Sequence, residues 1–236
     1  MLWPTRSKSI FPNDTKMLRI KNSNLKGIVF DLDGTLMNSI VCFHSVINTL
    51  LNDHNHPSIT LDKLQPHADK GSRLVIAEFF QLDPQSDSVK KLQESFYQLW
   101  LERMVVSTPF YPGAQELLET LTHAKTPWGI VSNRPARFAQ PLIQHHRIFD
   151  YAHCLVWGDT YSMNKPHPIQ LKKACEMLGT ESQHTLYVGD TENDMLAAHR
   201  NQMPFALAEY GYLRAESNIE TLKADYRLQS IKQIIP

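Results

Sequence analysis

The sequence predicts an α/β fold: a Rossmann-like, three-layer core with a parallel sheet between helices, and an all-helical cap inserted after the first strand. Two observations predict it. Short apolar runs alternate with segments of helical periodicity, and one long segment near the start shows helical periodicity alone. Alternation of strands and helices indicates a parallel sheet, because parallel strands need a crossover connection between them.

Five short apolar runs are the predicted strands, and each ends near polar residues or glycine. They are residues 27–30, 127–131, 154–157, 185–188 and 205–208. Three helices are predicted between strands, at residues 115–121, 169–178 and 195–199. Pro112 and Gly113 precede the first of these helices and Gly179 follows the second, which are common positions for residues that start or end a helix.

Residues 39–108 break the alternation, because they show only helical patterns. Apolar residues recur at helical spacing in three stripes, which are Val46, Ile47, Leu50 and Leu51, then Leu74, Val75, Phe79 and Phe80, then Leu92, Phe96, Leu99 and Trp100. We therefore expect a helical cap domain at 39–108 and a catalytic core at 25–38 and 109–236. A cap at this position would exclude water from a site at the first strand and would set selectivity.

Composition narrows the class of protein. The 236 residues include 24 Lys or Arg and 24 Asp or Glu, so the overall charge gives no reason to expect nucleic acid or an acidic membrane as a partner. No apolar run approaches the roughly 20 residues that span a bilayer. Three widely separated cysteines, Cys42, Cys154 and Cys175, predict free thiols in a reducing compartment. We expect a cytoplasmic protein, a monomer or homodimer, that acts on a small molecule.

Residues 1–24 are expected to form an N-terminal extension outside the core. The first 26 residues carry six Lys or Arg against one acid, Asp14, and they lack the continuous apolar stretch of a secretory signal. A basic, acid-poor start is also found in organelle transit peptides. A frayed extension, or a true start at Met17, is the plainer interpretation and is preferred.

Asp31 and Asp33 lie in the run Asp-Leu-Asp-Gly-Thr-Leu, directly after the first predicted strand. Side chains alternate along a strand, but a turn at Gly34 would let both carboxylates reach one pocket. One carboxylate could then attack a phosphorus atom while the other handles a proton. Mg²⁺ prefers such oxygen ligands. Alone, this run is also consistent with a strand end followed by an Asp-Gly turn.

Two further signals lie downstream. Ser132 and Asn133 follow the second predicted strand, where a hydroxyl and backbone N–H groups can bind phosphoryl oxygens. Lys165 precedes a proline, and a lysine fixed by a rigid loop could neutralise both a nucleophile and a phosphoryl group. Each signal is weak alone, because Ser-Asn is a common strand-to-turn pair and a loop lysine usually faces solvent.

The last signal is Gly-Asp-Thr-Glu-Asn-Asp at residues 189–194, which follows a predicted strand. Asp190 and Asp194 are thereby expected at the carboxyl end of the sheet, where ligands bind in open α/β folds. Acids that merely complement the dipole of a helix start are the alternative, and this alternative has more weight for Glu192 than for Asp190.

The four signals, D-x-D-G-T-L, S-N, K-P and G-D-x-x-x-D in that order, resemble the haloacid dehalogenase superfamily, specifically its Mg²⁺-dependent phosphatases with a helical cap. The resemblance covers nearly the whole chain after about residue 25. It implies a hydrolase of phosphoric monoesters that acts through an aspartyl-phosphate intermediate, with Mg²⁺ as the cofactor.

The resemblance also implies a role for each acid. Asp31 is the nucleophile, and Asp33 protonates the leaving alcohol and then activates water. Asp31, the backbone carbonyl of Asp33 and Asp190 hold Mg²⁺, with Asp194 close by or acting through water.

The remaining motif residues are implied to bind the phosphoryl group. Ser132 and the backbone of Asn133 bind its oxygens, and Lys165 stabilises the negative charge during transfer. The implied catalytic set is therefore Asp31, Asp33, Ser132 and Lys165.

Within the superfamily, the chain looks like the phosphoglycolate phosphatase group and is also similar to N-acetylmuramic acid 6-phosphate phosphatases. Both implied substrates carry a carboxylate, so a cation from the cap is expected. Arg73 is the candidate cation, and with the preceding Gly71 it is a candidate for substrate binding at a predicted helix start. A solvated arginine there is an equal alternative. Arg134 is expected either to contact the substrate or to pair with an acid.

Other functions of the same fold stay open. A phosphonate hydrolase would need a cap lysine that forms an imine, for which Lys63 and Lys70 are available. A phosphomutase would hand the phosphoryl group from the aspartate to a sugar hydroxyl. A catalytically silent binding protein is the alternative from another class, because fold alone does not define function.

Overall fold

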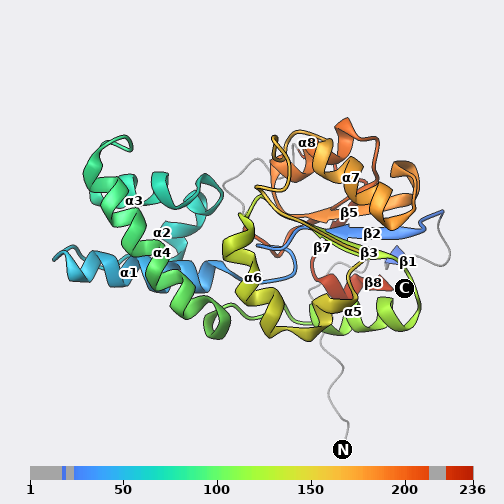
Figure 1. Cartoon of the computed structure of the whole chain (residues 1–236), viewed down its shortest axis with the longest axis horizontal. Helices are drawn as coiled ribbons and strands as arrows, with labels where there is room; N and C mark the ends of the chain where they lie inside the picture. Colours follow the sequence, from blue (N-terminus) through green and yellow to red (C-terminus); the bar gives the residue numbers. More distant parts are fainter. Residues whose placement is uncertain (1–17, 20–23, 213–221, 236) are drawn as a thin grey trace, which may run out of the picture.

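Six parallel strands form the central sheet of this computed structural model, which describes residues 18–19, 24–212 and 222–235 (Figure 1). The sheet order is β4-β3-β2-β5-β6-β7. The strands are β2 (Gly27–Phe30), β3 (Trp128–Val131), β4 (Cys154–Val156), β5 (Thr185–Gly189), β6 (Phe205–Ala208) and β7 (Tyr226–Leu228). Because the strand order reverses at β2, the carboxyl end of β2 is the topological switch point at which such sheets bind ligands.

Helices cover both faces of this sheet, as the sequence predicts. The residues of β2 divide between the two faces: Ile28 and Phe30 belong to the apolar cluster that includes α5 (Ala114–His123) and α6 (Ala136–His145). Val29 belongs to the cluster that includes α7 (Ile169–Leu178) and α8 (Glu192–Arg200). Burial on both faces explains why β2 is a continuous apolar run instead of an alternating one.

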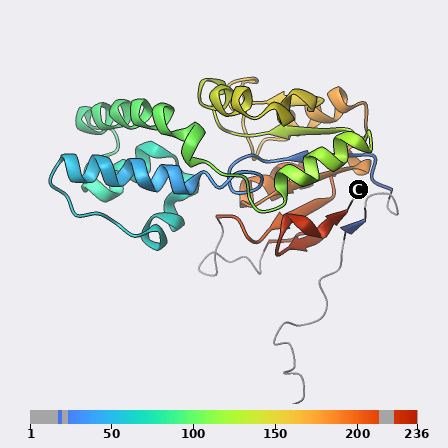
Figure 2. The ribbon, with the colours of Figure 1, turned by 90° about the horizontal axis from the view of Figure 1, so that it is seen from below.

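The second part of the molecule, the helical unit, lies beside one end of the core in both views (Figures 1 and 2). Its backbone between residues 40 and 107 contains α1 (Ile40–Asp53), α2 (Leu61–Leu64), the 3₁₀ turn η1 (Gln65–Lys70), α3 (Ser72–Phe80) and α4 (Asp87–Ser107). Phe43 of α1 packs on Phe96 of α4 with ring centroids 4.7 Å apart. The apolar stripes of the sequence therefore form most of the interior of this unit, whereas Leu74 of the second stripe is exposed.

The helical unit contacts the core through aromatic side chains of α4. Tyr97 and Trp100 both pack against Phe138 of α6, with ring centroids 4.6 Å and 5.4 Å apart. These rings join the two parts at the end of the sheet where the loop after β2 runs into α1.

Several short elements were outside the sequence prediction. They are β7, helix α6, the 3₁₀ turns η2 (Arg147–Tyr151), η3 (Ser182–His184) and η5 (Ile231–Gln233), and a second small sheet. In that sheet β1 (Leu18–Arg19) pairs in parallel with β8 (Ile234–Ile235). Two residues of the expected N-terminal extension thus pair with the chain's end, while residues 1–17 and 20–23 lie outside the described residues.

Two expectations from composition can be compared with the structure. Cys42, Cys154 and Cys175 are buried free thiols. No helix in the described ranges has the length and apolar character needed to cross a membrane.

Candidate active site

The loop after β2 places Asp31 at the switch point of the sheet. The Asp31 backbone N–H donates to the Val188 carbonyl of β5 at 2.8 Å, and its carboxylate side chain is buried. The chain then turns at Gly34, whose φ of +84° favours glycine. A Cβ at Gly34 would also lie only 2.1 Å from Asp190 Oδ2. Both the turn and the close approach of Asp190 therefore require glycine at this position.

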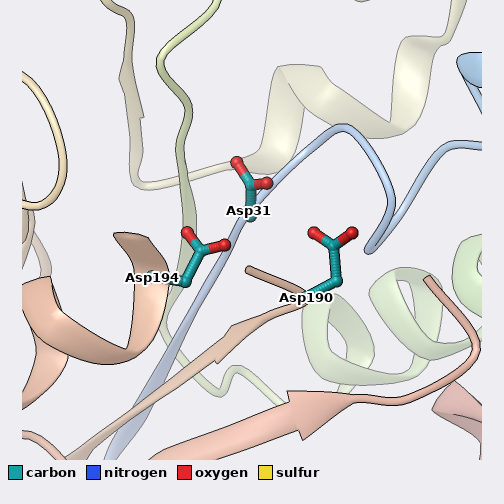
Figure 3. A group of neighbouring side chains, drawn as sticks. All are labelled: Asp31, Asp190 and Asp194. Atoms are coloured by element: carbon teal, nitrogen blue, oxygen red, sulfur yellow. The ribbon is translucent and has the colours of Figure 1, made fainter. Parts of the chain in front are cut away.

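Three carboxylates converge at the ends of β2 and β5 (Figure 3). Asp31, Asp190 and Asp194 each offer an oxygen within 4.8 Å of the others, and all three are buried. Phe30 pairs with Val188 in the sheet, so the residues that follow these strands are brought together. Asp194 is fixed further by a capping box at the start of α8, where its Oδ2 accepts from the Thr191 hydroxyl at 2.6 Å.

Lys165 lies between two of these carboxylates. Its ammonium group donates to Asp31 Oδ1 at 2.8 Å and to Asp194 Oδ1 at 2.6 Å, and it also bonds the Tyr187 hydroxyl at 2.8 Å. The side chain is 3% exposed. Asn133 holds the Lys165 backbone by accepting from its N–H at 3.0 Å and donating to its carbonyl at 2.9 Å. Lys165 is therefore a buried residue of the site and does not face solvent.

The charges of this cluster are incompletely balanced by the protein. Burial raises the pKa of Asp31 to about 7 against the opposing effect of Lys165. Burial, followed by the charges of Asp194 and Asp31, raises the pKa of Asp190 well above its usual range. Burial also acts to raise the pKa of Asp194, but the charge of Lys165 and the hydrogen bonds from Lys165, Thr191 and Tyr187 together outweigh it, and the pKa is lowered.

The donor set fits a divalent cation. Three buried carboxylates face one ammonium group, which leaves an excess of two negative charges when all are ionised. Among the described residues, the Asp190 carboxylate receives a 2.8 Å bond from the Tyr212 N–H and a 3.4 Å bond from the Thr35 hydroxyl, and neither of these partners carries charge. Carboxylate oxygens are the ligands that Mg²⁺ prefers.

Ser132 and Asn133 follow β3 on the other side of β2. Ser132 is 2% exposed, and its hydroxyl accepts from the Arg134 N–H at 3.2 Å. Both residues line the same cavity as Asp31 and Lys165. The position suits the predicted contact with phosphoryl oxygens, while the Asn133 amide has the additional task of holding Lys165.

Asp33, two residues after Asp31, also lines this cavity. Its carboxylate accepts hydrogen bonds from the Ser39 hydroxyl, directly before α1, and from the guanidinium of Arg134. The Arg134 Nε donates to Asp33 Oδ2 at 2.8 Å. Of the two expectations for Arg134, the structure shows the pairing with an acid.

The cavity between the core and the helical unit has a volume of about 280 Å³. Its core side carries the polar groups described above. Its other wall is largely aromatic and aliphatic, and the residues of the helical unit that line it are Ile40, Phe43, Gly71, Ser72, Tyr97 and Trp100. Gly71, a candidate substrate-binding residue, is one of these lining residues.

Arg73 is placed differently from the sequence expectation. It is not among the residues that line the cavity. Its Nε donates to the Pro84 carbonyl at 2.8 Å, and its Nη2 donates to the Gln85 side chain. The guanidinium is engaged by the loop between α3 and α4, so this geometry gives no support to Arg73 as the cation that recognises substrate.

Two tyrosines of the site were missed by sequence reasoning. The Tyr187 hydroxyl, fully buried on β5, donates to Asp194 Oδ1 at 2.7 Å while accepting from Lys165. A tyrosine in an otherwise apolar strand was the available signal, because a buried hydroxyl needs a partner. Tyr212 holds Asp190 through its backbone N–H, a contact that no side-chain pattern reveals.

With this geometry in view, the chain can be placed among known proteins. Residues 28–208 match the profile of the haloacid dehalogenase-like hydrolases. The chain belongs to this family, and the predicted resemblance is confirmed.

Relatives of known name share most of the chain's length. An N-acetylmuramic acid 6-phosphate phosphatase from Pseudomonas aeruginosa is 29% identical over 92% of this chain and 96% of its own. A phosphoglycolate phosphatase from Xanthomonas campestris is 31% identical over 89% of this chain and 94% of its own.

Solved structures show the same fold. A crystal structure described as a predicted phosphoglycolate phosphatase from Haemophilus somnus superimposes with a TM-score of 0.78 at 27% identity. It covers 89% of this chain and 96% of its own. The predicted α/β fold class is thereby confirmed.

Proposed function

We propose that this protein is a Mg²⁺-dependent phosphomonoesterase that acts through an aspartyl-phosphate on Asp31. The observation that carries the proposal is the position of Asp31. Its carboxylate lies at the switch point of the sheet, 2.8 Å from the buried ammonium of Lys165, in a cavity that Ser132 also lines. A cation next to the nucleophile offsets the repulsion between a carboxylate and an incoming phosphate dianion.

The proposed reaction has two steps. In the first, a carboxylate oxygen of Asp31 attacks phosphorus, the bond from phosphorus to the alcohol oxygen breaks, and Asp33 gives a proton to that oxygen. In the second, water attacks the phosphorus of the aspartyl-phosphate and Asp33 takes a proton from this water. The bond from phosphorus to the Asp31 oxygen breaks, which restores the Asp31 carboxylate and releases inorganic phosphate. Lys165 and the groups at Ser132 and Asn133 stabilise the charge of the transferring phosphoryl group.

The residues proposed to hold Mg²⁺ are Asp31, Asp190 and the backbone carbonyl of Asp33, with Asp194 close by or acting through water. Bound Mg²⁺ would neutralise negative charge on the carboxylates and on the phosphoryl oxygens. The support for this assignment is the cluster of three buried carboxylates with an excess of negative charge.

The first substrate to test is 2-phosphoglycolate, since several relatives of about 30% identity carry that name. The second is N-acetylmuramic acid 6-phosphate, which a specific observation favours. Phe43, Tyr97, Trp100 and Phe138 all line the cavity. Aromatic walls of this extent suit a substrate with a sugar ring better than a two-carbon acid, which would leave them uncovered.

The test is release of inorganic phosphate from both compounds, side by side, with Mg²⁺ and with Asp31→Asn as the blank. A strong preference for one compound would identify the substrate. Turnover of p-nitrophenyl phosphate alone would retain the chemistry and reject both substrates. No Mg²⁺-dependent phosphate release from any of the three would overturn the proposed function.

Three other expectations from the sequence remain predictions. These are a cytoplasmic location, a monomeric or homodimeric state, and the lack of a nucleic acid or membrane partner. Size-exclusion chromatography with light scattering would measure the oligomeric state directly.

A further inference from the structure

Arg134 lies in the wall of the cavity, where its guanidinium is bound on several sides. Its Nε and Nη2 donate to the two carboxylate oxygens of Asp33, with 2.8 Å for the Nε bond. Its Nη1 donates to the Phe138 carbonyl at 3.0 Å. The Trp100 ring of α4 lies under the guanidinium, 4.6 Å from its carbon to the ring centroid. The side chain is 3% exposed.

These contacts leave Arg134 poorly suited to bind substrate. A guanidinium has five N–H donors in a rigid, planar fork, and this one presents the side of the fork that matches a carboxylate to Asp33. A third N–H donates to the Phe138 carbonyl of the following helix, α6, and one face is covered by Trp100. Three of the five N–H groups are thereby engaged, and the side chain is only 3% exposed, so little of the guanidinium is open to a substrate anion.

We propose that Arg134 is a positioning residue: it orients the carboxylate of Asp33 for proton transfer and does not contact the substrate. The inference rests on the proposed function, in which Asp33 protonates the leaving alcohol and then takes a proton from water. A two-point contact fixes the plane of a carboxylate, whereas a single hydrogen bond leaves it free to rotate.

The structure shows what would remain without Arg134. The other described contact of the Asp33 carboxylate is one bond from the Ser39 hydroxyl, at the junction with the helical unit. Proton transfer needs the donor within hydrogen-bond reach of the oxygen it serves, so a rotating Asp33 would lose efficiency in both steps. Because Trp100 supports the guanidinium, the packing of α4 on the core contributes to the placement of Asp33.

Two substrates of nearly equal shape test this role. Phenyl phosphate has a poor leaving group that needs protonation, and p-nitrophenyl phosphate has a good one that needs little. The value of kcat/KM reports the first step, and kcat on p-nitrophenyl phosphate reports the second step when hydrolysis of the phosphoenzyme is slow. The variants are Arg134→Met, which keeps the apolar stem, and Arg134→Lys, which keeps the charge but loses the fork.

For Arg134→Met we expect kcat/KM on phenyl phosphate to fall by about tenfold to a hundredfold, which is a part of the roughly 10²–10⁴-fold that general acid–base catalysis contributes. On p-nitrophenyl phosphate, kcat/KM should change by less than about threefold while kcat falls by about tenfold or more. Arg134→Lys should show the same pattern with a smaller loss. Retained kcat/KM on the nitro compound also shows that the variant is folded.

The matched control is Arg137→Met, three residues further along the chain and inside α6. Arg137 is exposed and stacks on Phe138 at 4.4 Å, without a bond to Asp33. It should leave the ratio of the two kcat/KM values unchanged. If Arg134→Met does not fold, Arg134→Lys carries the test alone.

Two results would overturn the inference. Equal loss of kcat/KM on both aryl phosphates would mean that Arg134 acts in binding or in structure only. A loss confined to the carboxylate-bearing 2-phosphoglycolate would make Arg134 a substrate ligand. An inactive wild-type protein would instead refute the proposed function, so the two failures are distinguishable.

Discussion

The two walls of the cavity differ in how their side chains are held. On the core wall, Asp31, Asp194 and Lys165 are joined by buried ion pairs and by the Tyr187 hydroxyl. The wall from the helical unit is built from rings in van der Waals contact, such as Tyr97 and Trp100 against Phe138. Directional, charged contacts fix atoms for chemistry, whereas apolar contacts shape a volume and tolerate change. We therefore propose that the core determines the reaction type and that the helical unit determines selectivity.

The largest effect is expected at the nucleophile. Asp31→Asn should lower phosphate release by at least about 10³-fold, since the amide cannot form the aspartyl-phosphate. The fold should persist, because Lys165 keeps its bond to Asp194. Phosphate release together with circular dichroism checks both statements, and a variant that still turns over would refute the assignment of Asp31.

Lys165→Met should affect both activity and stability. It leaves Asp31 and Asp194 buried without their cation, and loss of one partner of a buried pair typically costs about 3–5 kcal/mol. Urea unfolding of the wild-type and variant proteins without metal measures this cost. Unchanged stability would contradict the view that buried ion pairs stabilise the core wall. The control is Lys173→Met, which removes an exposed ion pair with Glu176.

Removal of Mg²⁺ should reduce activity by about 10²-fold or more, and return of the ion should restore the activity. A second readout does not depend on turnover. Mg²⁺ should raise the Tm of the wild-type protein but raise that of Asp190→Asn much less, because the variant lacks one of the three clustered carboxylates. Equal shifts in both proteins would place the ion elsewhere.

Stability of the metal-free protein should fall as pH rises. Burial raises the pKa of Asp31 to about 7, so the folded state holds this proton more tightly than the unfolded state does. The resulting stabilisation is complete below about pH 4, the usual aspartate value, and is lost as pH rises through about 7. Asp190 acts in the same direction, since its pKa is also raised.

Urea unfolding at pH 5 and pH 8 in the presence of a chelator checks this dependence. Asp194, whose pKa is lowered, acts in the opposite direction, but its contribution changes only in acid, below the usual aspartate range. Asp31→Asn should flatten the slope between the two pH values, and a slope that the substitution leaves intact would contradict the assignment.

The aromatic wall should alter selectivity with little effect on chemistry. Tyr97→Ala removes a ring that lines the cavity and should change kcat/KM for the preferred substrate by about two- to tenfold. Its effect on p-nitrophenyl phosphate should be smaller, because that compound is not the one the wall is proposed to fit. A uniform loss of kcat on all compounds would contradict the proposal that the aromatic wall acts on selectivity and not on chemistry.

An effect of similar, small size is expected at Tyr187. Tyr187→Phe keeps the ring but removes the hydroxyl that bonds Asp194 and Lys165, a loss of about 1 kcal/mol. That corresponds to a fall in kcat of about fivefold if the bond is felt in the transition state. Steady-state kinetics measure it, and Tyr161→Phe, outside the cavity lining, serves as the control.

The sequence by itself determined the parts of this protein that local patterns encode. Apolar runs ended by Asp31, Ser132 or Asp190 predict strands with chemistry at their carboxyl ends, and a parallel sheet necessarily brings such ends to one edge. The helical stripes likewise predict the helical unit. Short strands such as β7 were not predicted, because two or three residues carry too little pattern to be recognised.

Tertiary structure alone decided which side chains meet. Arg134 and Asp33 are 101 positions apart, and their pairing depends on how α6 packs beside the loop after β2. Arg73 is close in sequence to the cavity-lining Gly71, yet its side chain does not line the cavity, because its guanidinium donates to the Pro84 carbonyl of a neighbouring loop. A periodic pattern reports which face of an element is buried, but the partner of a long polar side chain is set by distances between elements.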